Sequence, residues 1–359
     1  MRPLLVTVAA LVVLNAVLLL PRGGSQRRAA APRARVGLVF DVGGRGDKSF
    51  NDAAFIGIER AVREFGVEAQ YLEPGDGSDR ESGIRLLAAA GFDLVIGVGF
   101  MFSDDMYTVA REYPKVRFAC VDYAKFGPGG FVKPPPNLVA LKFREEEGAF
   151  LVGAVAALTS RTGTVGFVGG MDIPLIRRFE AGYRGGVARV CERCRVVAGY
   201  AGVTADAFKN PAKGKELGLA QYGAGADVIF HASGSTGLGV FEAARERGTY
   251  AIGVDADQWK EAPGRILTSM IKRVDVSVFE TVRAVIDGQF RGGVRTFGLK
   301  EGGIDWVYDA NNRALVRAAT HARVEELRRE IVAGRLVVPT SSLAPAGAPA
   351  SGPAGPARP

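Results

Sequence analysis

The chain has 359 residues, 47% of them hydrophobic, which is enough for two domains of ordinary size with substantial cores. Its formal net charge of +8 is concentrated at the ends, because six arginines precede the first acidic residue, Asp41, and a seventh is Arg358. The remaining chain carries a net charge of about +1, which excludes a basic surface that would need nucleic acid or another polyanion as its partner.

The first segment, MRPLLVTVAALVVLNAVLLLPRGGSQRR, has a basic start, an apolar run from Leu4 to Leu20 and a basic flank. This layout is typical of an export signal or a membrane anchor, so residues 1–35 are expected to precede the folded domain. A cleaved signal and an uncleaved anchor both remain open, because no small-residue cleavage site follows Leu20 directly. Either one predicts a protein of the cell envelope, periplasmic or at the extracytoplasmic face of the cytoplasmic membrane.

After this segment, short apolar and β-branched runs alternate with amphipathic stretches. Strands are predicted at 35–40, 67–73, 93–100, 116–122, 163–170, 194–202, 226–234 and 249–257, and helices at 50–66, 79–92, 102–114, 145–160, 173–190, 211–225 and 239–248. Apolar runs that are buried on both faces and separated by single helices require a parallel sheet with right-handed crossovers. The fold class predicted is therefore α/β, doubly wound.

Two such series of similar length, divided near residues 143–147, predict two lobes and a cleft within a domain at 36–338. The first lobe is expected at about 36–144 with a returning segment at about 256–303. The second lobe is expected at about 145–255 and continues at about 304–338. Residues 339–359 are rich in Ala, Pro and Gly and lack the apolar content to pack, so they are predicted to form a disordered tail.

Ligands of open α/β sheets gather beyond the carboxyl ends of the strands, where loops converge and helix N-termini point. The residues predicted at these ends are Asp41, Ser49, Phe50, Asn51, Phe102, Ser103, Asp122, Met171, Asp172, Phe179, Ser235, Thr236, Asp255 and Lys272. An aromatic pair suits a flat heterocycle, and an amide suits a purine edge. Carboxylates beside a lysine suit vicinal hydroxyls. The combination indicates a base plus a ribose.

A phosphate is disfavoured, because Asp41, Asp122 and Asp255 would repel it and the chain has no GxxxxGK[ST] motif. The ligand is expected to be uncharged, with no cofactor, no metal and no catalytic residue. Each residue also has a structural alternative: Asp41 or Asp47 as a helix cap near Phe50, Asp255 in an Asx-turn, and Phe179 as a core residue. The pair in CERC, residues 191–194, favours a local disulfide or two ordinary thiols over a redox motif.

Several stretches in fixed order resemble one family: GLVFDVGGRGDKSFNDAAFIGI, VIFHASGSTGLGVFEAA, YAIGVDADQ and ILTSMIKRVD among them. They are similar to the basic membrane protein (BMP) family of ABC transporter substrate-binding proteins, purine nucleoside receptor-like, over roughly residues 36–309. The resemblance implies a type I periplasmic-binding-protein fold. Such a fold has two Rossmann-like lobes, crossover strands that serve as a hinge, and a nucleoside bound between the lobes.

The resemblance also implies roles for residues toward the base. Phe50 of DKSFND and Phe179 of IPLIRRFEAGY would sandwich the purine, and Asp41 and Asn51 would read its edge.

The roles implied toward the sugar fall on the remaining strand ends. Asp122 of CVDY, Asp255 of GVDAD and Lys272 of SMIKR would hold the ribose hydroxyls. Ser49 and the Gly234 region would line the pocket.

The function implied is a monomeric, non-enzymatic binding protein that delivers purine nucleosides to the permease of an ABC importer. Two departures from the family pattern stand out: no lipobox cysteine follows the apolar run, and HASG places His231 near the cleft. An anchored sensor that a membrane partner reads is the alternative, and an uncleaved N-terminal segment would favour it. A nucleoside hydrolase is disfavoured, because a lysine and aromatics accompany the carboxylates where a metal-ligand cluster would be needed.

Overall fold

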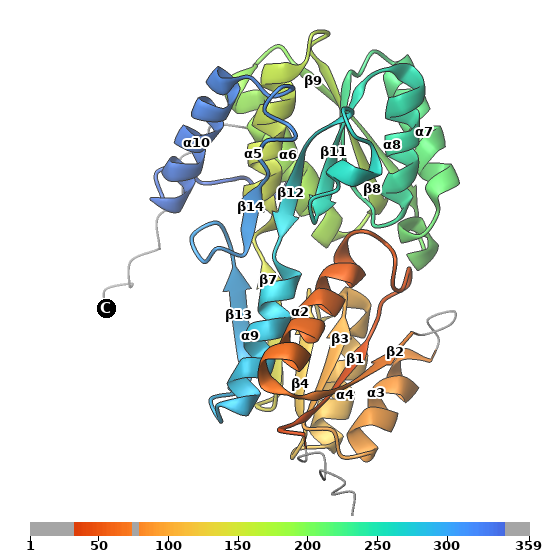
Figure 1. Cartoon of the computed structure of the whole chain (residues 1–359), viewed down its shortest axis with the longest axis vertical. Helices are drawn as coiled ribbons and strands as arrows, with labels where there is room; N and C mark the ends of the chain where they lie inside the picture. The colour runs from red at the N-terminus through yellow and green to blue at the C-terminus, as the bar shows by residue number, and fades with distance from the viewer. Residues whose placement is uncertain (1–31, 74–78, 342–359) are drawn as a thin grey trace, which may run out of the picture. The chain divides into compact units, whose positions relative to one another are not determined.

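In the computed structural model of the protein, residues 32–73 and 79–341 are described, and this part of the chain forms two six-stranded sheets and a small hairpin (Figure 1). The first sheet is parallel, with the order β13-β7-β4-β3-β1-β2. Its strands are β1 (Arg35–Val39), β2 (Glu68–Leu72), β3 (Leu94–Val98), β4 (Arg117–Val121), β7 (Leu138–Phe143) and β13 (Gly293–Phe297). The hairpin joins β5 (Phe126–Gly127) to β6 (Gly130–Phe131).

The second sheet has the order β14-β12-β11-β10-β8-β9. Its strands are β8 (Thr164–Met171), β9 (Arg195–Gly202), β10 (Val228–Ala232), β11 (Tyr250–Asp255), β12 (Ile266–Lys272) and β14 (Ile304–Trp306). All neighbouring pairs are parallel except β12 and β14, which run antiparallel.

Helices cover the faces of both sheets (Figure 1). Those of the first sheet are α2 (Phe50–Phe65), α3 (Arg80–Ala89), α4 (Ser103–Glu112) and α9 (Val274–Ile286). Those of the second are α5 (Glu145–Thr159), α6 (Pro174–Val190), α7 (Pro211–Gly223), α8 (Thr236–Arg247) and α10 (Ala318–Val332). Three short 3-10 helices are η1 (Phe100–Phe102), η2 (Ala205–Phe208) and η3 (Trp259–Glu261). Each sheet with its helices is called the first or the second lobe below.

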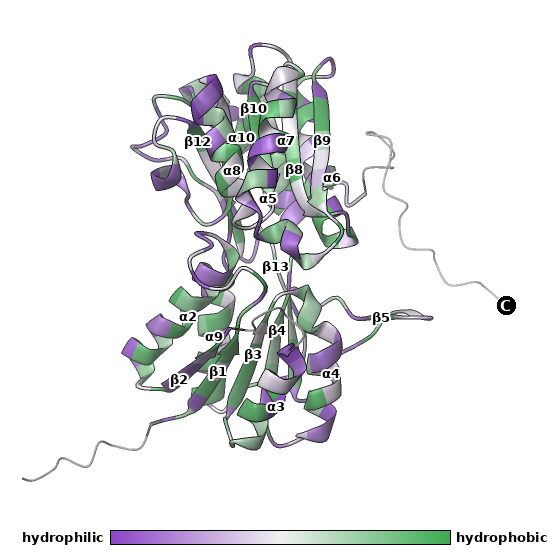
Figure 2. Ribbon diagram, turned by 90° about the vertical axis from the view of Figure 1, so that its right-hand side faces the viewer, coloured by the Kyte–Doolittle hydropathy of each residue, from purple (hydrophilic) through white to green (hydrophobic). Residues whose placement is uncertain are grey.

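The alternation of side chains along a strand explains why the central strands are apolar throughout. In β1, Leu38 belongs to the cluster that includes Ile58 of α2, whereas its neighbour Val39 belongs to the cluster that includes Ile84 of α3. A strand with helices on both faces needs apolar residues at every position. Figure 2 shows the result as strands β1, β3 and β4 that are coloured largely as hydrophobic.

The chain passes between the lobes three times: from β7 to α5, from β12 to α9 and from β13 to β14. Hydrogen bonds tie these passages together. The backbone N–H of Arg144 donates to the Phe297 carbonyl (2.9 Å), and that of Arg273 donates to the Gly303 carbonyl (2.8 Å). The three passages are therefore neighbours joined by backbone hydrogen bonds, which is the kind of connection from which hinge closure arises in two-lobe proteins.

The strand order differs from the expectation at one point. The segment 256–303 was expected to return to the first lobe as a whole, but β12 pairs with β11 in the second sheet. We therefore begin the return after Lys272, the last residue of β12, and α9 then starts at Val274. The reason is packing: Leu267 and Met270 of β12 are fully buried, so this strand extends the second sheet before the chain crosses.

Two expectations concern residues at or near the ends of the described range. The signal or anchor at 1–35 and the tail at 339–359 lie almost entirely outside the described residues. Within the described residues, no helix has the length and apolar character that crossing a membrane requires.

All three cysteines are described: Cys191 and Cys194 form a disulfide, and Cys120 is buried with a free thiol.

Candidate functional site

The carboxyl ends of strands from both sheets meet at one cleft. The first lobe contributes the ends of β1, β3 and β4, and the second lobe contributes those of β10, β11 and β12, together with the first turns of α6. The lining residues are Asp41, Val42, Gly43, Asp47, Phe50, Asn51, Gly99, Phe100, Asp122, Leu175, Ile176, Phe179, Phe208, Ala232, Ser233, Gly234, Val254, Asp255 and Lys272. The empty space in the cleft is about 620 Å³, including the part open to solvent.

The loop after β1 is held in shape by carboxylates that accept from its own backbone. Asp47 accepts hydrogen bonds from the backbone N–H groups of Ser49 (2.9 Å), Asn51 (2.8 Å) and Asp52 (3.1 Å). These groups are unpaired donors at the start of α2, so Asp47 fulfils the capping role that the sequence left open between it and Asp41. The cap fixes where α2 begins, and thereby where Phe50 lies.

Asn51 and Asp41 form a second unit within this loop. The Asn51 side-chain oxygen accepts from the Asp41 backbone N–H (3.0 Å), and its amide nitrogen donates to Asp47 Oδ2 (3.1 Å). Asp41 Oδ1 accepts from the Val42 backbone N–H (2.7 Å). Each of these polar groups retains further hydrogen-bonding capacity, since a carboxylate oxygen and an amide oxygen can each accept twice.

Lys272 lies at the end of β12 and is only 2% exposed. Its ammonium group donates to Asp122 Oδ2 of the first lobe at 2.5 Å. The same nitrogen lies 4.9 Å from the ring centre of Phe50, 4.9 Å from that of Phe143 and 5.8 Å from that of Phe179. The lysine is therefore placed among aromatic faces from both lobes, where a cation is stabilised by the ring electrons.

The second carboxylate that is expected to hold the ribose, Asp255, also joins the lobes. Ser49 Oγ, at the start of α2, donates to Asp255 Oδ2 at 2.5 Å, at the end of β11. Asp122 and Asp255 both have left-handed backbones, with φ of 60° and 66°. This region is unfavourable for residues other than glycine and is often found where function requires it.

Burial shifts the pKa values of the groups in the cleft. It raises the pKa of Asp41 to about 7, against the opposing influences of the Val42 N–H and Arg80. It raises the pKa of Asp255 to about 6, although Lys272 lowers it. Burial alone would lower the pKa of Lys272, but Asp122, Glu145 and Asp255 together raise it. The lysine is therefore charged, while Asp41 and Asp255 titrate close to neutrality.

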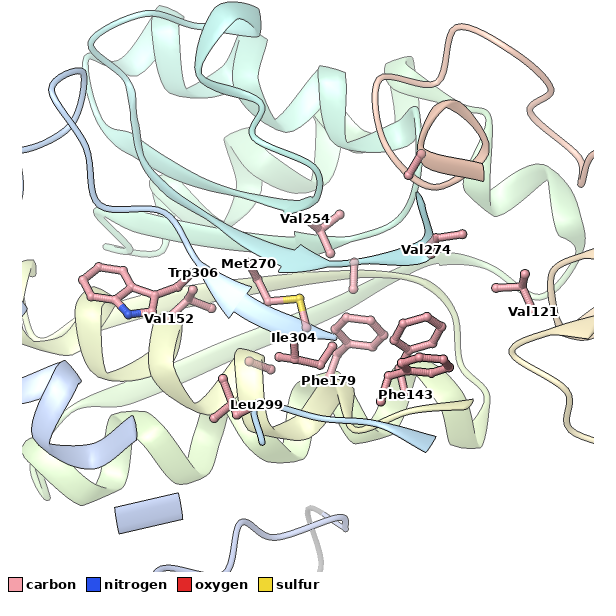
Figure 3. Packing of buried hydrophobic residues seen from close by; sticks show 14 of the residues in the cluster. Val121, Phe143, Val152, Phe179, Val254, Met270, Val274, Leu299, Ile304 and Trp306 are labelled. Atoms are coloured by element: carbon pink, nitrogen blue, oxygen red, sulfur yellow. The ribbon is translucent and has the colours of Figure 1, made fainter. Parts of the chain in front are cut away.

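Phe179 is a core residue and a lining residue at once. It is 3% exposed, and its ring lies 6.5 Å from that of Phe230 in the second lobe. Figure 3 shows Phe179 beside Phe143, within the cluster that also holds Met270 and Ile304. Phe179 is therefore a core residue, as its structural alternative predicted, and it also lines the cleft.

Of the nine residues assigned to ligand binding, all but Ser49 line the cleft; Ser49 contacts Asp255 instead. His231 does not line it in the described structure. It is fully buried, its Nε2 lies 3.1 Å from Gln258 Oε1, and its ring meets that of Phe241 edge-on. Burial lowers the pKa of His231 to about 4, so it is a neutral residue of β10 behind the cleft.

Two aromatic residues of the cleft were missed. Phe100 and Phe208 come from opposite lobes, with ring centres 6.4 Å apart. Phe102 was predicted at the end of β3, but the 3-10 turn η1 directs it into the core and leaves Phe100 at the cleft. The apolar Leu175 and Ile176 were also missed. Among the described residues, no group of three or more His, Cys, Asp or Glu side chains could hold a metal ion.

Known proteins of one family are similar to this chain. The family model Bmp, described as ABC transporter substrate-binding protein PnrA-like, matches residues 34–342. A lipoprotein of Pyrococcus abyssi is 36% identical, over 79% of this chain and 71% of its own. The ABC transporter nucleoside-binding protein BmpA of Lactococcus lactis is 31% identical, over 85% of this chain and 89% of its own.

Among solved structures, an ABC transporter solute-binding protein of Aeropyrum pernix matches with a TM-score of 0.76 and 32% identity, over 86% of this chain and 94% of its own. The α/β class and the two-lobe type I binding-protein fold predicted from the sequence are thereby confirmed. The family consists of substrate-binding proteins, which also confirms that the protein is not an enzyme. The chain belongs to the Bmp family of ABC transporter substrate-binding proteins.

Proposed function

We propose that the protein binds purine nucleosides in the cleft between its lobes and presents them to the permease of an ABC importer at the cell envelope. The observation that carries this proposal is that aromatic rings and charged groups of both lobes converge on the cleft. Phe50 and Asp122 come from the first lobe, and Phe179, Asp255 and Lys272 come from the second. A ligand that contacts both sets would favour the closed arrangement of the lobes.

The base would lie between the rings of Phe50 and Phe179. Both rings face the same ammonium group, so a flat molecule inserted there would be covered on two sides and would stay close to the charged groups. Stacking keeps the ring faces of a heterocycle away from water and leaves its edge free for hydrogen bonds. Phe100 and Phe208 would add apolar surface at the rim.

The edge of the base would meet Asp41 and Asn51. A carboxyl group with a pKa near 7 can accept from a ring N–H when ionised and can donate to a ring nitrogen when protonated. The amide of Asn51 is already oriented by Asp41 and Asp47, so it would offer a fixed donor and acceptor pattern. Oriented polar groups of this kind discriminate between bases that differ at one edge.

The ribose would be held by Asp122, Asp255 and Lys272, with Ser49 supporting Asp255 and Gly234 lining the cleft. Carboxylates accept hydrogen bonds from vicinal hydroxyl groups, and the ammonium donates to them. The same carboxylates, with Asp41, would repel a phosphate group. We therefore expect nucleosides to bind and nucleotides to be rejected.

Delivery to a permease fits the membership in a family of ABC transporter substrate-binding proteins, and the lipoprotein among the relatives favours a place at the cell envelope. The relative from Lactococcus lactis is named a nucleoside-binding protein, which supports the choice of ligand class. We propose that the protein acts as a monomer, since both halves of the cleft come from one chain.

The test is a calorimetric titration of the full-length protein, unfolded and refolded beforehand to strip any bound ligand. Adenosine, guanosine, inosine, uridine, ribose and AMP serve as ligands. We expect saturable heat with the purine nucleosides, and at most weak heat with ribose and AMP. The absence of heat and of any thermal shift with all three purine nucleosides would contradict the proposal.

A further inference from the structure

One contact between the lobes joins residues that do not line the cleft. Gln258, in the loop after β11, donates from Nε2 to the backbone carbonyl of Lys48 in the first lobe at 3.1 Å. Gln258 is 1% exposed, and neither it nor Lys48 is among the described residues that line the cleft. This bond joins the lobes without touching the space that a ligand would occupy.

Three groups of the second lobe hold the Gln258 side chain and its backbone in place. Oε1 accepts from the Val254 backbone N–H (2.9 Å) and lies 3.1 Å from His231 Nε2, while the Gln258 backbone N–H donates to Ser269 Oγ (3.0 Å). The Val254 N–H can only donate and the Lys48 carbonyl can only accept, which settles the orientation of the amide. His231 must then donate from Nε2, and its Nδ1 accepts from Ser233 Oγ (3.3 Å).

The acceptor belongs to the turn from which two proposed base-binding residues emerge. Lys48 has a left-handed backbone, with φ of 56°, and its N–H donates to Asp52 Oδ2 at 3.1 Å. It directly precedes Ser49, after which Phe50 and Asn51 begin α2. A contact that holds the Lys48 carbonyl therefore also holds the start of this helix against the second lobe.

We propose that Gln258 is a positioning residue for ligand binding: it latches the turn of the first lobe to the second and so sets the population of the closed state for every ligand. The assignment of ligands rests on the proposed function, whereas the latch itself can be measured without any ligand. The apparent affinity of a closing protein scales with the fraction of molecules that are competent to bind. Loss of the latch should therefore lower the affinity for all ligands by one common factor.

The variant that isolates the latch is Gln258→Glu. It keeps an oxygen for the Val254 N–H and for His231 Nε2. Its ionised carboxylate, for which both variants are measured at alkaline pH, faces the Lys48 carbonyl with an oxygen where the parent protein has a donor. The matched control is Gln221→Glu, because Gln221 is a buried amide of the second lobe whose Nε2 donates to the Phe167 carbonyl (2.8 Å) within that lobe. Both variants bury one carboxyl group, but only Gln258→Glu removes a bond between the lobes.

Closure is measured by the distance between spin labels introduced by Asp104→Cys and Asp206→Cys. Both positions are exposed, at the starts of α4 and η2, near the Phe100 and Phe208 rings that meet across the cleft. Cys120 is buried and the other two cysteines are paired, so the introduced thiols take the labels. Without ligand, we expect Gln258→Glu to increase the population with long distances and Gln221→Glu to leave the distribution as in the parent protein.

With ligand, we expect Gln258→Glu to lower the affinities for adenosine, guanosine and inosine by the same factor. This factor is roughly three- to tenfold, which is the usual effect of losing one hydrogen bond. An unchanged distance distribution would overturn the proposal. So would a loss of affinity that differs between the nucleosides, or an equal loss in Gln221→Glu. If the parent protein binds no nucleoside, the proposed function fails, and the distances between the labels still decide whether Gln258 is a latch.

Discussion

Phe50 is the first residue of α2 and remains partly exposed, with its ring 4.9 Å from the Lys272 ammonium. A phenylalanine in that position gains less from burial in its own lobe than a core residue would. Its place is determined by the cap that Asp47 provides and by the tight glycine turns before it, at Gly43, Gly44 and Gly46, which have positive φ. The ring is thus presented to the cleft by backbone geometry.

If a base stacks on this ring, Phe50→Ala should weaken nucleoside binding by about 1 to 3 kcal/mol. The control is Phe126→Ala, because Phe126 lies in the β5–β6 hairpin, is 59% exposed and is absent from the described lining of the cleft. Calorimetric titration of both variants measures the effect. If both variants bind nucleosides with equal affinity, no base stacks on Phe50.

Asp41 makes the stability of the ligand-free protein depend on pH. Its pKa of about 7 in the folded state exceeds the ordinary 3.8, so between these values the unfolded chain is ionised while the folded chain keeps its proton. The free energy of unfolding should therefore fall as pH rises from 4 to 7, by about 4 kcal/mol for this residue, and then level off.

The variant Asp41→Asn keeps an oxygen for the Val42 N–H and removes this titration. Urea unfolding at pH 4, 5.5, 7 and 8 should show that the variant loses less stability with rising pH than the parent protein does. Asp255, with a pKa of about 6, contributes in the same direction in both proteins and cancels in the comparison. Parallel pH profiles would show that the pKa of Asp41 is the same in the folded and the unfolded protein, which would contradict the prediction.

At the scale of elements, α5 and α6 of the second lobe pack closely through glycines. A Cβ atom at Gly186 would lie 1.9 Å from the Phe150 carbonyl oxygen, and one at Gly182 would lie 2.2 Å from the Glu146 carbonyl oxygen. Backbone atoms cannot give way as a flexible side chain can. This contact fixes α6, which carries Phe179, against α5, which follows the first passage between the lobes.

We predict that Gly186→Ala lowers the free energy of unfolding by about 3 kcal/mol, because overpacking forces the two helices apart. Gly223→Ala is the matched helical control, since a Cβ there would meet nothing within 4 Å among the described residues. It should be neutral or stabilising by at most about 1 kcal/mol. Urea denaturation of both variants measures the free energies of unfolding. Equal values would contradict the close packing of α6 against α5 at Gly186.

Elements with strong local patterns could be predicted from the sequence. The apolar runs that became β1, β3 and β4 are buried on both faces, and the residues that follow them are found at the cleft. Elements whose place depends on distant pairing could not be predicted. The segment that became β12 has the composition of a strand, but its assignment to the second sheet comes from pairing with β11 and β14. The misplaced Phe102 has a different cause: the 3-10 turn η1 buries Phe102 and leaves Phe100 at the cleft, through a local geometry that no residue pattern marks.

At the scale of the whole molecule, the site depends on contacts between residues far apart in the chain. Lys272 and Asp122 are 150 positions apart, and Gln258 and Lys48 are 210 apart. Periodicity cannot reveal such pairs. Positions at strand ends supplied the candidate residues, and the resemblance to a family supplied their expected roles. The structure supplied the bonds between them, including the Gln258 contact that motif reading missed.

All the proposed roles depend on one claim: a purine nucleoside binds between the lobes, with its base flanked by Phe50 and Phe179. The most direct measurement is a crystal structure of the protein with the nucleoside that gives the largest heat on titration. We predict the base between these two rings and the ribose hydroxyls within hydrogen-bond distance of Asp122, Asp255 or Lys272. A nucleoside bound outside the cleft, or in the cleft without contact to either ring, would contradict the claim.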